Sequence, residues 1–292
     1  MKNILLLAAF LCFNTLAIAQ KVVEPSTQAH PEWSKPYPPF QIVGNLYYVG
    51  TYDLACYLIT TPKGHILINT GLAASAPAIK TSIQKLGFKF SDIKILLTTQ
   101  AHFDHMGGMA AIKKLTHAKL MVDAGDVGVV EDGGKSDYAM GAGDCVFEPV
   151  KVDRILKNND VIKLGGMQII MLHHPGHTKG SCSFLFDMAD NTRSYKVLIA
   201  NLPTIITDKK FSEVSVYPTI AQDYAYTLKA MKGLKFDIWL ASHASQFGLA
   251  RKHHPGDKYN PAAFIDRKGY DAQLNEMQKA YDLKVKQDKL SH

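Results

Sequence analysis

The sequence has little of several features that mark special classes of protein. It contains four cysteines and two tryptophans in 292 residues, and no CxxC pair suggests a zinc knuckle. Charged residues make up 20% of the chain and hydrophobic residues 47%, which excludes a disordered or collagen-like protein. The net charge of +7 is too diffuse to indicate a particular ligand. With no Arg-rich stripe and no aromatic–basic alternation, we expect no nucleic-acid partner.

Long apolar runs are also missing, apart from one at the N-terminus. Lys2 precedes an unbroken apolar run from Ile4 to Phe13, and Ala17-Ile18-Ala19 matches the small-residue pattern of a cleavage site. The run is too short to span a bilayer, which needs about 20 residues. We therefore expect residues 1–19 to be a secretory signal peptide and residues 20–292 to form one mature domain. The protein is expected to be periplasmic, without a membrane anchor.

Loss of the signal peptide would remove Cys12 and leave an odd number of cysteines. Cys56, Cys145 and Cys182 allow at most one internal disulfide. Buried thiols are the expectation for all three, because unpaired cysteine behaves as a small apolar residue. The spacing does not indicate which two would pair.

Strands and helices are predicted to interleave along the mature chain. Apolar runs bounded by turn residues predict strands at 54–59, 65–69, 93–99, 167–172, 181–186, 196–200 and 237–242. Helical periodicity predicts helices at 76–86, 107–115, 221–231 and 270–288. The stretch between 116 and 166 is expected to be irregular. This alternation favours an α/β sandwich over an all-β barrel.

Polar side chains with metal-binding chemistry follow three of the predicted strands. They are Gln100, His102, Asp104, His105, His177 and His243. A single histidine would mean little, but three separate strand ends that each deliver imidazole are hard to explain by packing. Zinc accepts histidine nitrogen and aspartate oxygen, and a catalytic zinc site keeps one coordination position open for water. The sequence therefore predicts a metal site.

These motifs resemble the metallo-β-lactamase superfamily, whose signature is HxHxDH followed by two further histidines. Within the superfamily the sequence looks like subclass B3, and the glutamine in place of the first motif histidine looks like its GOB branch. The resemblance covers the mature chain and implies an α/β fold, the αβ/βα four-layer sandwich, with metals in a groove between the sheet edges. By position it implies a first zinc site of Gln100, His102 and His177. The implied second site consists of Asp104, His105 and His243.

The resemblance also implies an activity. One or two Zn²⁺ ions would hydrolyse the β-lactam ring of penicillins, cephalosporins or carbapenems and so confer antibiotic resistance. Zinc lowers the pKa of bound water to about 7, so a metal-bound hydroxide is available at neutral pH. Asp104 is expected to be the catalytic residue that orients this hydroxide. We expect a small-molecule β-lactam as the partner and a monomeric protein.

The chain departs from the superfamily pattern after the strand at 196–200. It reads Ala200-Asn201-Leu202-Pro203 where glyoxalase II, lactonase and phosphodiesterase members usually carry a bridging aspartate. Leu202 also stands where subclass B3 typically has a serine, so Thr204 is the candidate for a substrate-binding hydroxyl. Two alternatives stay open. One is another hydrolase of this fold, glyoxalase II-like or a lactonase, and the other is a periplasmic zinc-binding protein without turnover.

Polar residues outside the motifs are expected to have other roles. Asn69, where many superfamily members have aspartate, is interpreted as a structural turn residue. His173 should face away from the metals by strand alternation, and the His253-His254 pair lies in a polar segment that we expect to be solvated or to support the site from behind. The hydrophobic segment from Trp33 to Phe40 is a candidate to overhang the groove.

Gln100 provides a test of the two implied sites. An amide oxygen is a weaker zinc ligand than imidazole, so the second site should bind zinc more tightly. Replacing Gln100 by His should raise the occupancy of the first site, whereas replacing His243 by Ala should remove the tighter ion and most activity. Metal titration with cobalt substitution measures both effects. If His243→Ala keeps the tighter ion and Gln100→Ala loses it, the two sites are assigned the wrong way round.

Overall fold

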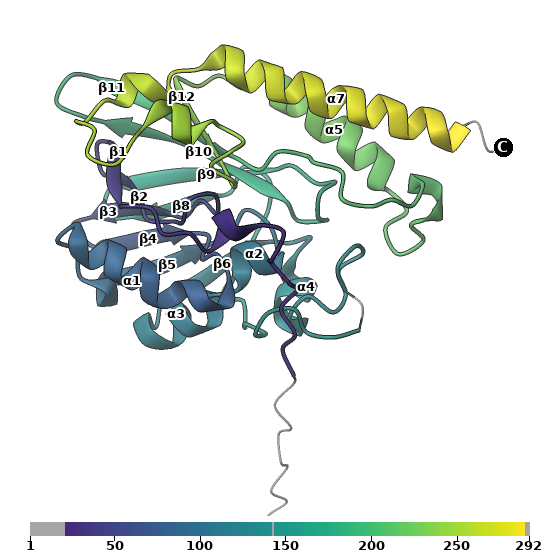
Figure 1. Cartoon of the computed structure of the whole chain (residues 1–292), viewed down its shortest axis with the longest axis horizontal. Helices are drawn as coiled ribbons and strands as arrows, with labels where there is room; N and C mark the ends of the chain where they lie inside the picture. Colours follow the sequence, from purple (N-terminus) through teal and green to yellow (C-terminus); the bar gives the residue numbers. More distant parts are fainter. Residues whose placement is uncertain (1–20, 142, 290–292) are drawn as a thin grey trace, which may run out of the picture.

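The computed structural model describes residues 21–141 and 143–289, so the predicted signal peptide at residues 1–19 lies outside the described residues. Two β-sheets face each other, and helices cover the outer face of each sheet (Figure 1). The layers run helix, sheet, sheet, helix, which confirms the predicted αβ/βα four-layer sandwich. Among the described residues, no helix has the length and apolar character that a membrane span requires.

The first sheet has seven strands in sequential order. They are β1 (Phe40–Val43), β2 (Leu46–Tyr48), β3 (Tyr57–Thr61), β4 (Gly64–Ile68), β5 (Ile93–Leu97), β6 (Lys119–Asp123) and β7 (Arg154–Leu156). Strands β1 to β4 pair antiparallel, and β4 to β7 pair parallel. Parallel strands need crossover connections, and helices α1 (Ala76–Lys85) and α3 (Met109–Thr116) supply two of them on the outer face.

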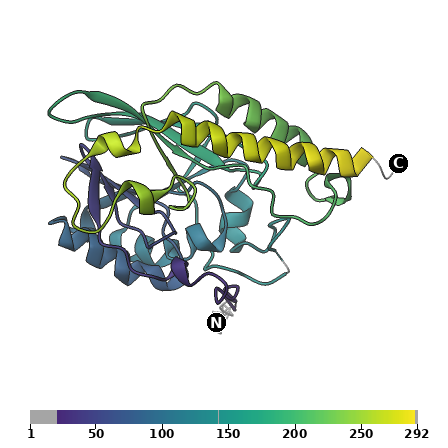
Figure 2. The same cartoon turned by 45° about the horizontal axis from the view of Figure 1, so that its top comes forward.

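The second sheet has five strands in the order β12-β11-β10-β9-β8. They are β8 (Val161–Leu164), β9 (Met167–His173), β10 (Cys182–Ala189), β11 (Ser194–Ala200) and β12 (Ile238–Ala241). Helices α5 (Ile220–Lys232) and α7 (Arg267–Lys289) run side by side along the top of the molecule, outside this sheet (Figure 2). Only the β11–β12 pair is parallel in this sheet.

Short helices fill the connections. The α-helices are α2 (Phe103–Met106), α4 (Val127–Asp132) and α6 (Leu249–Lys252), and the 3-10 turns are η1 (Pro31–Trp33), η2 (Ala73–Ser75), η3 (Phe90–Asp92), η4 (Phe211–Glu213) and η5 (Pro261–Phe264). Helix α2 begins within the run of polar residues that follows β5, so Asp104 and His105 lie in one turn of helix and Gln100 and His102 in the loop before it.

The main hydrophobic core lies between the two sheets. Tyr57 of the first sheet and Phe184 and Trp239 of the second are fully buried in it. The hydroxyl of Tyr57 donates a hydrogen bond to the carbonyl of Ala241 at 2.6 Å, which ties β3 to the end of β12. Burial of each such large side chain stabilises the fold by about 1.5–3 kcal/mol. The contact between the sheets thus fixes where the strand ends meet.

The prediction of an irregular stretch from 116 to 166 is wrong. Strands β6, β7 and β8 and helix α4 lie in this stretch. These elements are short, and β7 has three residues, so they contain too few residues for a periodic pattern. Strand β6 is buried along most of its length, which gives an apolar run rather than an alternation.

The described cysteines behave as expected, whereas one histidine does not. Cys56, Cys145 and Cys182 are all buried. His253 is 8% exposed rather than solvated, because its ring stacks on Phe40 with a centroid distance of 3.6 Å. The adjacent His254 is exposed, as predicted.

Gly107, which follows α2, is a position where the surrounding backbone leaves no space for a side chain. A Cβ at Gly107 would lie 2.3 Å from the amide nitrogen of Ala73 and 2.4 Å from the carbonyl carbon of Leu72. Gly107→Ala should therefore lower the free energy of unfolding of the metal-free protein by about 1–3 kcal/mol. Gly128→Ala in α4 is the matched control, since nothing lies within 4 Å of its Cβ position. Urea unfolding of both variants measures the difference, and equal stabilities would contradict the packing of α2 on this backbone.

Candidate metal centre

Asp104, His105 and His243 form a compact cluster of possible metal ligands. One ligand atom from each lies within 4.8 Å of those of the other two. The Nε2 atoms of His105 and His243 each lie 3.3 Å from Oδ2 of Asp104. Asp104 and His105 come from α2 after β5, and His243 follows β12. The two sheets therefore deliver one carboxylate and two imidazoles to the same place.

Gln100, His102 and His177 lie beside this cluster. All three are buried, and the rings of His102 and His177 meet edge to face with a centroid distance of 4.9 Å. Burial and the nearby His102 lower the pKa of His177 to about 3, and the hydrogen bond to Thr204 and the charge of Asp104 only partly oppose this shift. His177 is therefore neutral at physiological pH and can offer a lone pair to a metal.

The cluster around Asp104 is electrostatically tight. Burial opposes ionisation of Asp104, but His105 and His243 hold its pKa well below its usual range. Burial also opposes a proton on His243, yet hydrogen bonds to Asp104 and Asp53 raise its pKa to about 9. A divalent cation would take the place of this proton, because metal ligands bind in their deprotonated form.

Two of the histidines have their Nδ1 atom occupied by the protein. His243 Nδ1 lies 2.9 Å from Oδ2 of Asp53, and His177 Nδ1 donates to the carbonyl oxygen of Thr204 at 2.8 Å. A carbonyl oxygen only accepts, so Nδ1 of His177 carries the proton and Nε2 keeps its lone pair. Such partners fix the tautomer and the orientation of metal-ligating histidines.

In His102 it is Nε2, not Nδ1, that faces an oxygen of the protein. This Nε2 faces Oδ2 of the buried Asp137 at 3.4 Å, an ion-pair contact rather than a hydrogen bond, so Nδ1 is the atom left for a metal. The other oxygen of Asp137 accepts hydrogen bonds from the amides of Ala139 and Met140 at 2.9 and 2.7 Å. These bonds fix the carboxylate, and the pKa of Asp137 stays below its usual value because His102 and these amides outweigh burial.

One buried carboxylate joins the two loops that carry Gln100 and His177. Asp126 accepts hydrogen bonds from the amide of Ala101 at 2.9 Å and from the hydroxyl of Thr178 at 2.7 Å through Oδ2. Its other oxygen accepts the amide of Gly180 at 2.7 Å. The loops after β5 and β9 are therefore fixed to each other through one side chain.

Asn69 has the structural role that the sequence predicted. It adopts a left-handed backbone conformation with φ of 61°, which asparagine tolerates better than most residues. Its side-chain oxygen accepts hydrogen bonds from the amide and hydroxyl of Thr99 at 2.9 and 3.2 Å. The turn after β4 thereby anchors the segment that leads into Gln100.

Several buried polar atoms of the centre have no hydrogen-bond partner among the described residues. They include Oε1 of Gln100, Oδ1 of Asp104 and Nδ1 of His105. A buried polar atom without a partner costs about 1–3 kcal/mol, so native proteins rarely leave several together. Amide oxygen, carboxylate and imidazole are all ligands of zinc. The residues present therefore fit a metal centre.

Three supporting residues were missed by the sequence reasoning. They are Asp53, Asp126 and Asp137, each far from the motifs along the chain. Trp33, in the segment expected to overhang the groove, does lie beside His243 with a ring distance of 5.7 Å. Its indole nitrogen donates to Oδ2 of Asp53 at 3.2 Å. His173 pairs with Asp123 at 2.8 Å instead of joining the centre.

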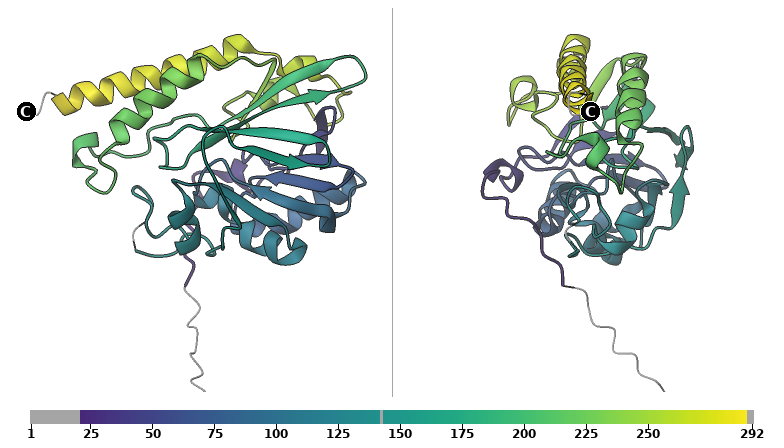
Figure 3. Two further views of the ribbon diagram at one scale, coloured as in Figure 1. Left: turned by 180° about the vertical axis from the view of Figure 1, so that it is seen from behind. Right: turned by 90° about the vertical axis from the view of Figure 1, so that its right-hand side faces the viewer.

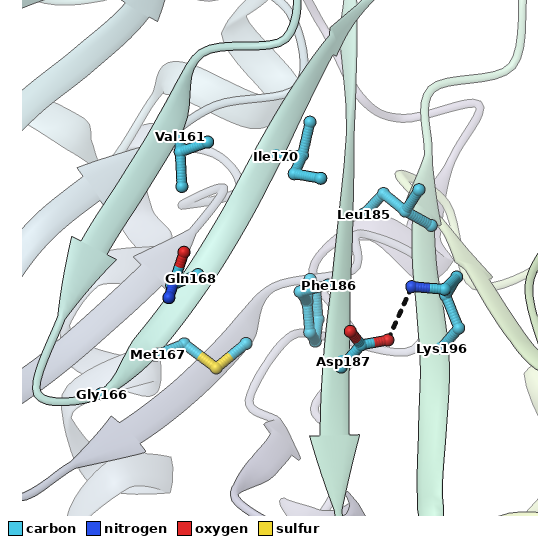
Figure 4. A pocket seen from close by; sticks show the side chains of 9 residues that line it. All are labelled: Val161, Gly166, Met167, Gln168, Ile170, Leu185, Phe186, Asp187 and Lys196. Atoms are coloured by element: carbon cyan, nitrogen blue, oxygen red, sulfur yellow. Dashed lines mark hydrogen bonds and ion pairs between the residues drawn. The ribbon is translucent and has the colours of Figure 1, made fainter.

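A hollow of about 390 Å³ lies on the second sheet (Figure 4). It is lined by side chains of β8 to β11, and Figure 4 shows its charged residues Asp187 and Lys196 joined by an ion pair of 2.7 Å. None of the motif residues lines this hollow. Because its two charges neutralise each other, the hollow offers no unpaired group comparable to those of the strand ends.

Comparisons with known proteins agree with the metal chemistry. A family model described as the metallo-beta-lactamase superfamily matches residues 51–190. The chain is 65% identical to the class B3 di-zinc metallo-beta-lactamase LRA-12 from an Alaskan soil metagenome, covering 89% of this chain and 98% of that one with a TM-score of 0.88. It is 58% identical to the metallo-beta-lactamase GOB-18 from Elizabethkingia meningoseptica, covering 92% and 99% of the two chains with a TM-score of 0.91.

Curated relatives are more distant. A hydroxyacylglutathione hydrolase of Rhodopseudomonas palustris is 28% identical over 131 residues, which is 45% of this chain and 42% of that protein. The chain thus spans less than half the length of that relative. An N-acyl homoserine lactonase of Bacillus cereus is 22% identical over 229 residues, which is 70% of this chain and 84% of that protein.

Asp53 provides a test of the geometry at His243. Asp53→Asn keeps the shape but removes the charge that receives the Nδ1 proton, so divalent-metal affinity of the Asp104 cluster should fall about 10–100-fold. Asp123→Asn is the matched control, because Asp123 makes the same kind of contact with His173, which lies outside the centre. Competition titration with a chromogenic chelator measures both. Equal affinities in the two variants would show that Asp53 does not orient His243.

Proposed function

Since this chain belongs to class B3 of the metallo-β-lactamase superfamily, we propose that it is a zinc-dependent hydrolase that opens the β-lactam ring of antibiotics. The observation that carries the proposal is the buried Asp104–His105–His243 cluster at the meeting point of the two sheets. The 65% identity with LRA-12 supports the same reading. Penicillins, cephalosporins and carbapenems are the proposed substrates, and resistance to them is the proposed outcome.

Two zinc sites are proposed from the motif residues. The first would consist of Gln100, His102 and His177, and the second of Asp104, His105 and His243. The second set keeps only histidine and aspartate, whereas the first includes a neutral amide, so we propose that the second binds zinc more tightly. One or two ions would then be present, depending on the supply of zinc.

The chain's own residues prepare the reaction. Zinc, when bound, acts as a Lewis acid and lowers the pKa of water. In the hydrolysis, the oxygen of water bonds to the lactam carbonyl carbon, the C–N bond breaks, and the nitrogen receives a proton. Asp104 is the proposed catalytic residue, because its unpartnered Oδ1 can accept a hydrogen bond from the attacking water. Asp53 and the Thr204 carbonyl hold His243 and His177 in the tautomers that leave Nε2 free.

Thr204 remains the proposed substrate-binding residue after β11. Its hydroxyl oxygen lies 2.9 Å from Nδ1 of His177, which already has the Thr204 carbonyl as an acceptor. The hydroxyl can therefore turn toward a substrate without leaving the histidine unpaired. Leu202 is 1% exposed and offers no such group.

The alternatives within the fold are less well supported. Hydroxyacylglutathione hydrolases and lactonases appear among the distant relatives, but this chain has no carboxylate in Ala200-Asn201-Leu202-Pro203, where such enzymes usually have one. A zinc-binding protein without turnover would need no carboxylate with an unpartnered oxygen beside the histidines. We also propose that residues 1–19 are a signal peptide, that the mature domain of residues 20–292 is periplasmic, and that it acts as a monomer.

Removal of metal tests this function. Dialysis against a strong chelator should abolish hydrolysis of a chromogenic cephalosporin, and added Zn²⁺ should restore it, because the water is activated only at the metal. Elemental analysis of the same samples gives the number of ions lost. Full activity in the metal-free protein would contradict the proposal. Zinc binding without turnover of any β-lactam would favour the non-catalytic alternative.

A further inference from the structure

The loop between β11 and α5 contacts His177. Residues 201–207 of this loop form neither helix nor strand. Its Thr204 carbonyl accepts two hydrogen bonds, one from His177 Nδ1 at 2.8 Å and one from the Tyr224 hydroxyl at 3.0 Å. The acceptor is a main-chain atom, so the position of the loop determines whether this hydrogen bond can orient the His177 ring.

The C-terminal end of α7 holds this loop. The ammonium group of Lys284 donates to the carbonyl oxygens of Thr207 and Asp208 at 2.8 and 3.0 Å. Asp288 accepts a hydrogen bond from the hydroxyl of Ser212 at 3.0 Å. Hydrogen bonds from a charged donor are stronger than neutral ones, so Lys284 is the main polar attachment at this point.

Apolar contacts add to the attachment. Tyr281 and Val285 of α7 pack against a small separate core that includes Phe211 and Tyr224. Phe211 lies between the other two rings, stacked on Tyr224 at 5.4 Å and 6.2 Å from Tyr281. This core continues to the metal centre, because the Tyr224 ring packs so closely on Gly176 that a Cβ there would lie 2.9 Å from it.

The last turns of α7 lie beyond the part of the helix that packs on the main core (Figure 3). Helix α7 extends past the end of the second sheet, alongside α5, and its last turns lie over the loop that leads into α5 (Figure 3). The near half of α7 packs on the main core through Tyr270 and Leu274. The far half contacts the loop and the small core instead, so it can loosen without opening the sandwich.

We propose that the far end of α7, residues 281–288, is a C-terminal clamp that positions His177, with Lys284 and Tyr281 as its positioning residues. The inference rests on the proposed function, since it concerns the affinity of the first zinc site. Release of the clamp lets the Thr204 carbonyl move away from Nδ1, so the His177 ring loses its fixed tautomer. The second site is unaffected, because Asp53 holds His243 from the first sheet.

The test is a two-site zinc titration of metal-free variants against a chromogenic chelator. Lys284→Met removes the ammonium but keeps the length of the side chain, and Tyr281→Ala removes the ring. Each should weaken the first site about tenfold and leave the second unchanged. Lys284→Arg keeps a charged donor and should recover most of the lost affinity.

Matched controls lie on the exposed face of the same helix turns. Lys286→Met removes an exposed ammonium, and Leu283→Ala shortens a side chain that is 62% exposed. Both should bind zinc like the unmodified protein. Cobalt spectra provide a second readout, because Lys284→Met should lose the signal of the first site alone. The unfolding temperature of each metal-free variant shows whether the sandwich is intact.

The possible outcomes distinguish failure of the proposed clamp from failure of the proposed function. Unchanged affinities in Lys284→Met and Tyr281→Ala would overturn the clamp while leaving β-lactam hydrolysis by the unmodified protein as proposed. Equal weakening of both sites, or a loss in the controls too, would show general loosening and would also overturn it. An unmodified protein that binds only one ion would refute the first site and the clamp together. Absence of β-lactam turnover with both sites filled would refute the function alone.

Discussion

Imidazole has two nitrogens, and a protein oxygen beside one of them fixes which nitrogen a metal can use. In this protein the oxygens that do so come from three separate regions. Asp53 precedes β3, Asp137 follows α4, and the Thr204 carbonyl follows β11. The proposed ligands follow strands of both sheets, and the His243–Asp53 pair joins the two, so the centre depends on the contact between the sheets. The buried Tyr57–Ala241 hydrogen bond and the core around it are as necessary to the site as the ligands are.

The proposed ligands could be named from the sequence, since their metal-binding side chains are concentrated in short motifs. Gln100 to His105 occupy consecutive or alternate positions after an apolar run, and His177 and His243 follow similar runs. Residue type and strand ends were enough to predict that these side chains meet. The four-layer sandwich was correct as well, although that prediction came from family resemblance more than from periodicity.

The supporting residues could not be predicted, for two physical reasons. Asp53, Asp126 and Asp137 have the same side chain as many exposed aspartates, and only their burial and partners distinguish them. The partner of His177 is a main-chain carbonyl, which every residue possesses. Strands β7 and β8 were not predicted because three or four residues contain too few alternations to reveal a period. Trp33 reaches the centre only because the segment before β1 crosses to the end of β12.

The contact between Lys284 and the loop after β11 has a consequence for the order in which the protein matures. A chain is synthesised from its N-terminus, and the residues of the first site are complete once His177 has been made. The group that steadies the Thr204 loop is added more than a hundred residues later, near the end of α7. With the clamp proposed above, His177 would gain its full support only after the last helix has been made and has docked. Selection on the sequence of the last turns of α7 would then change zinc binding, although no proposed metal ligand lies there.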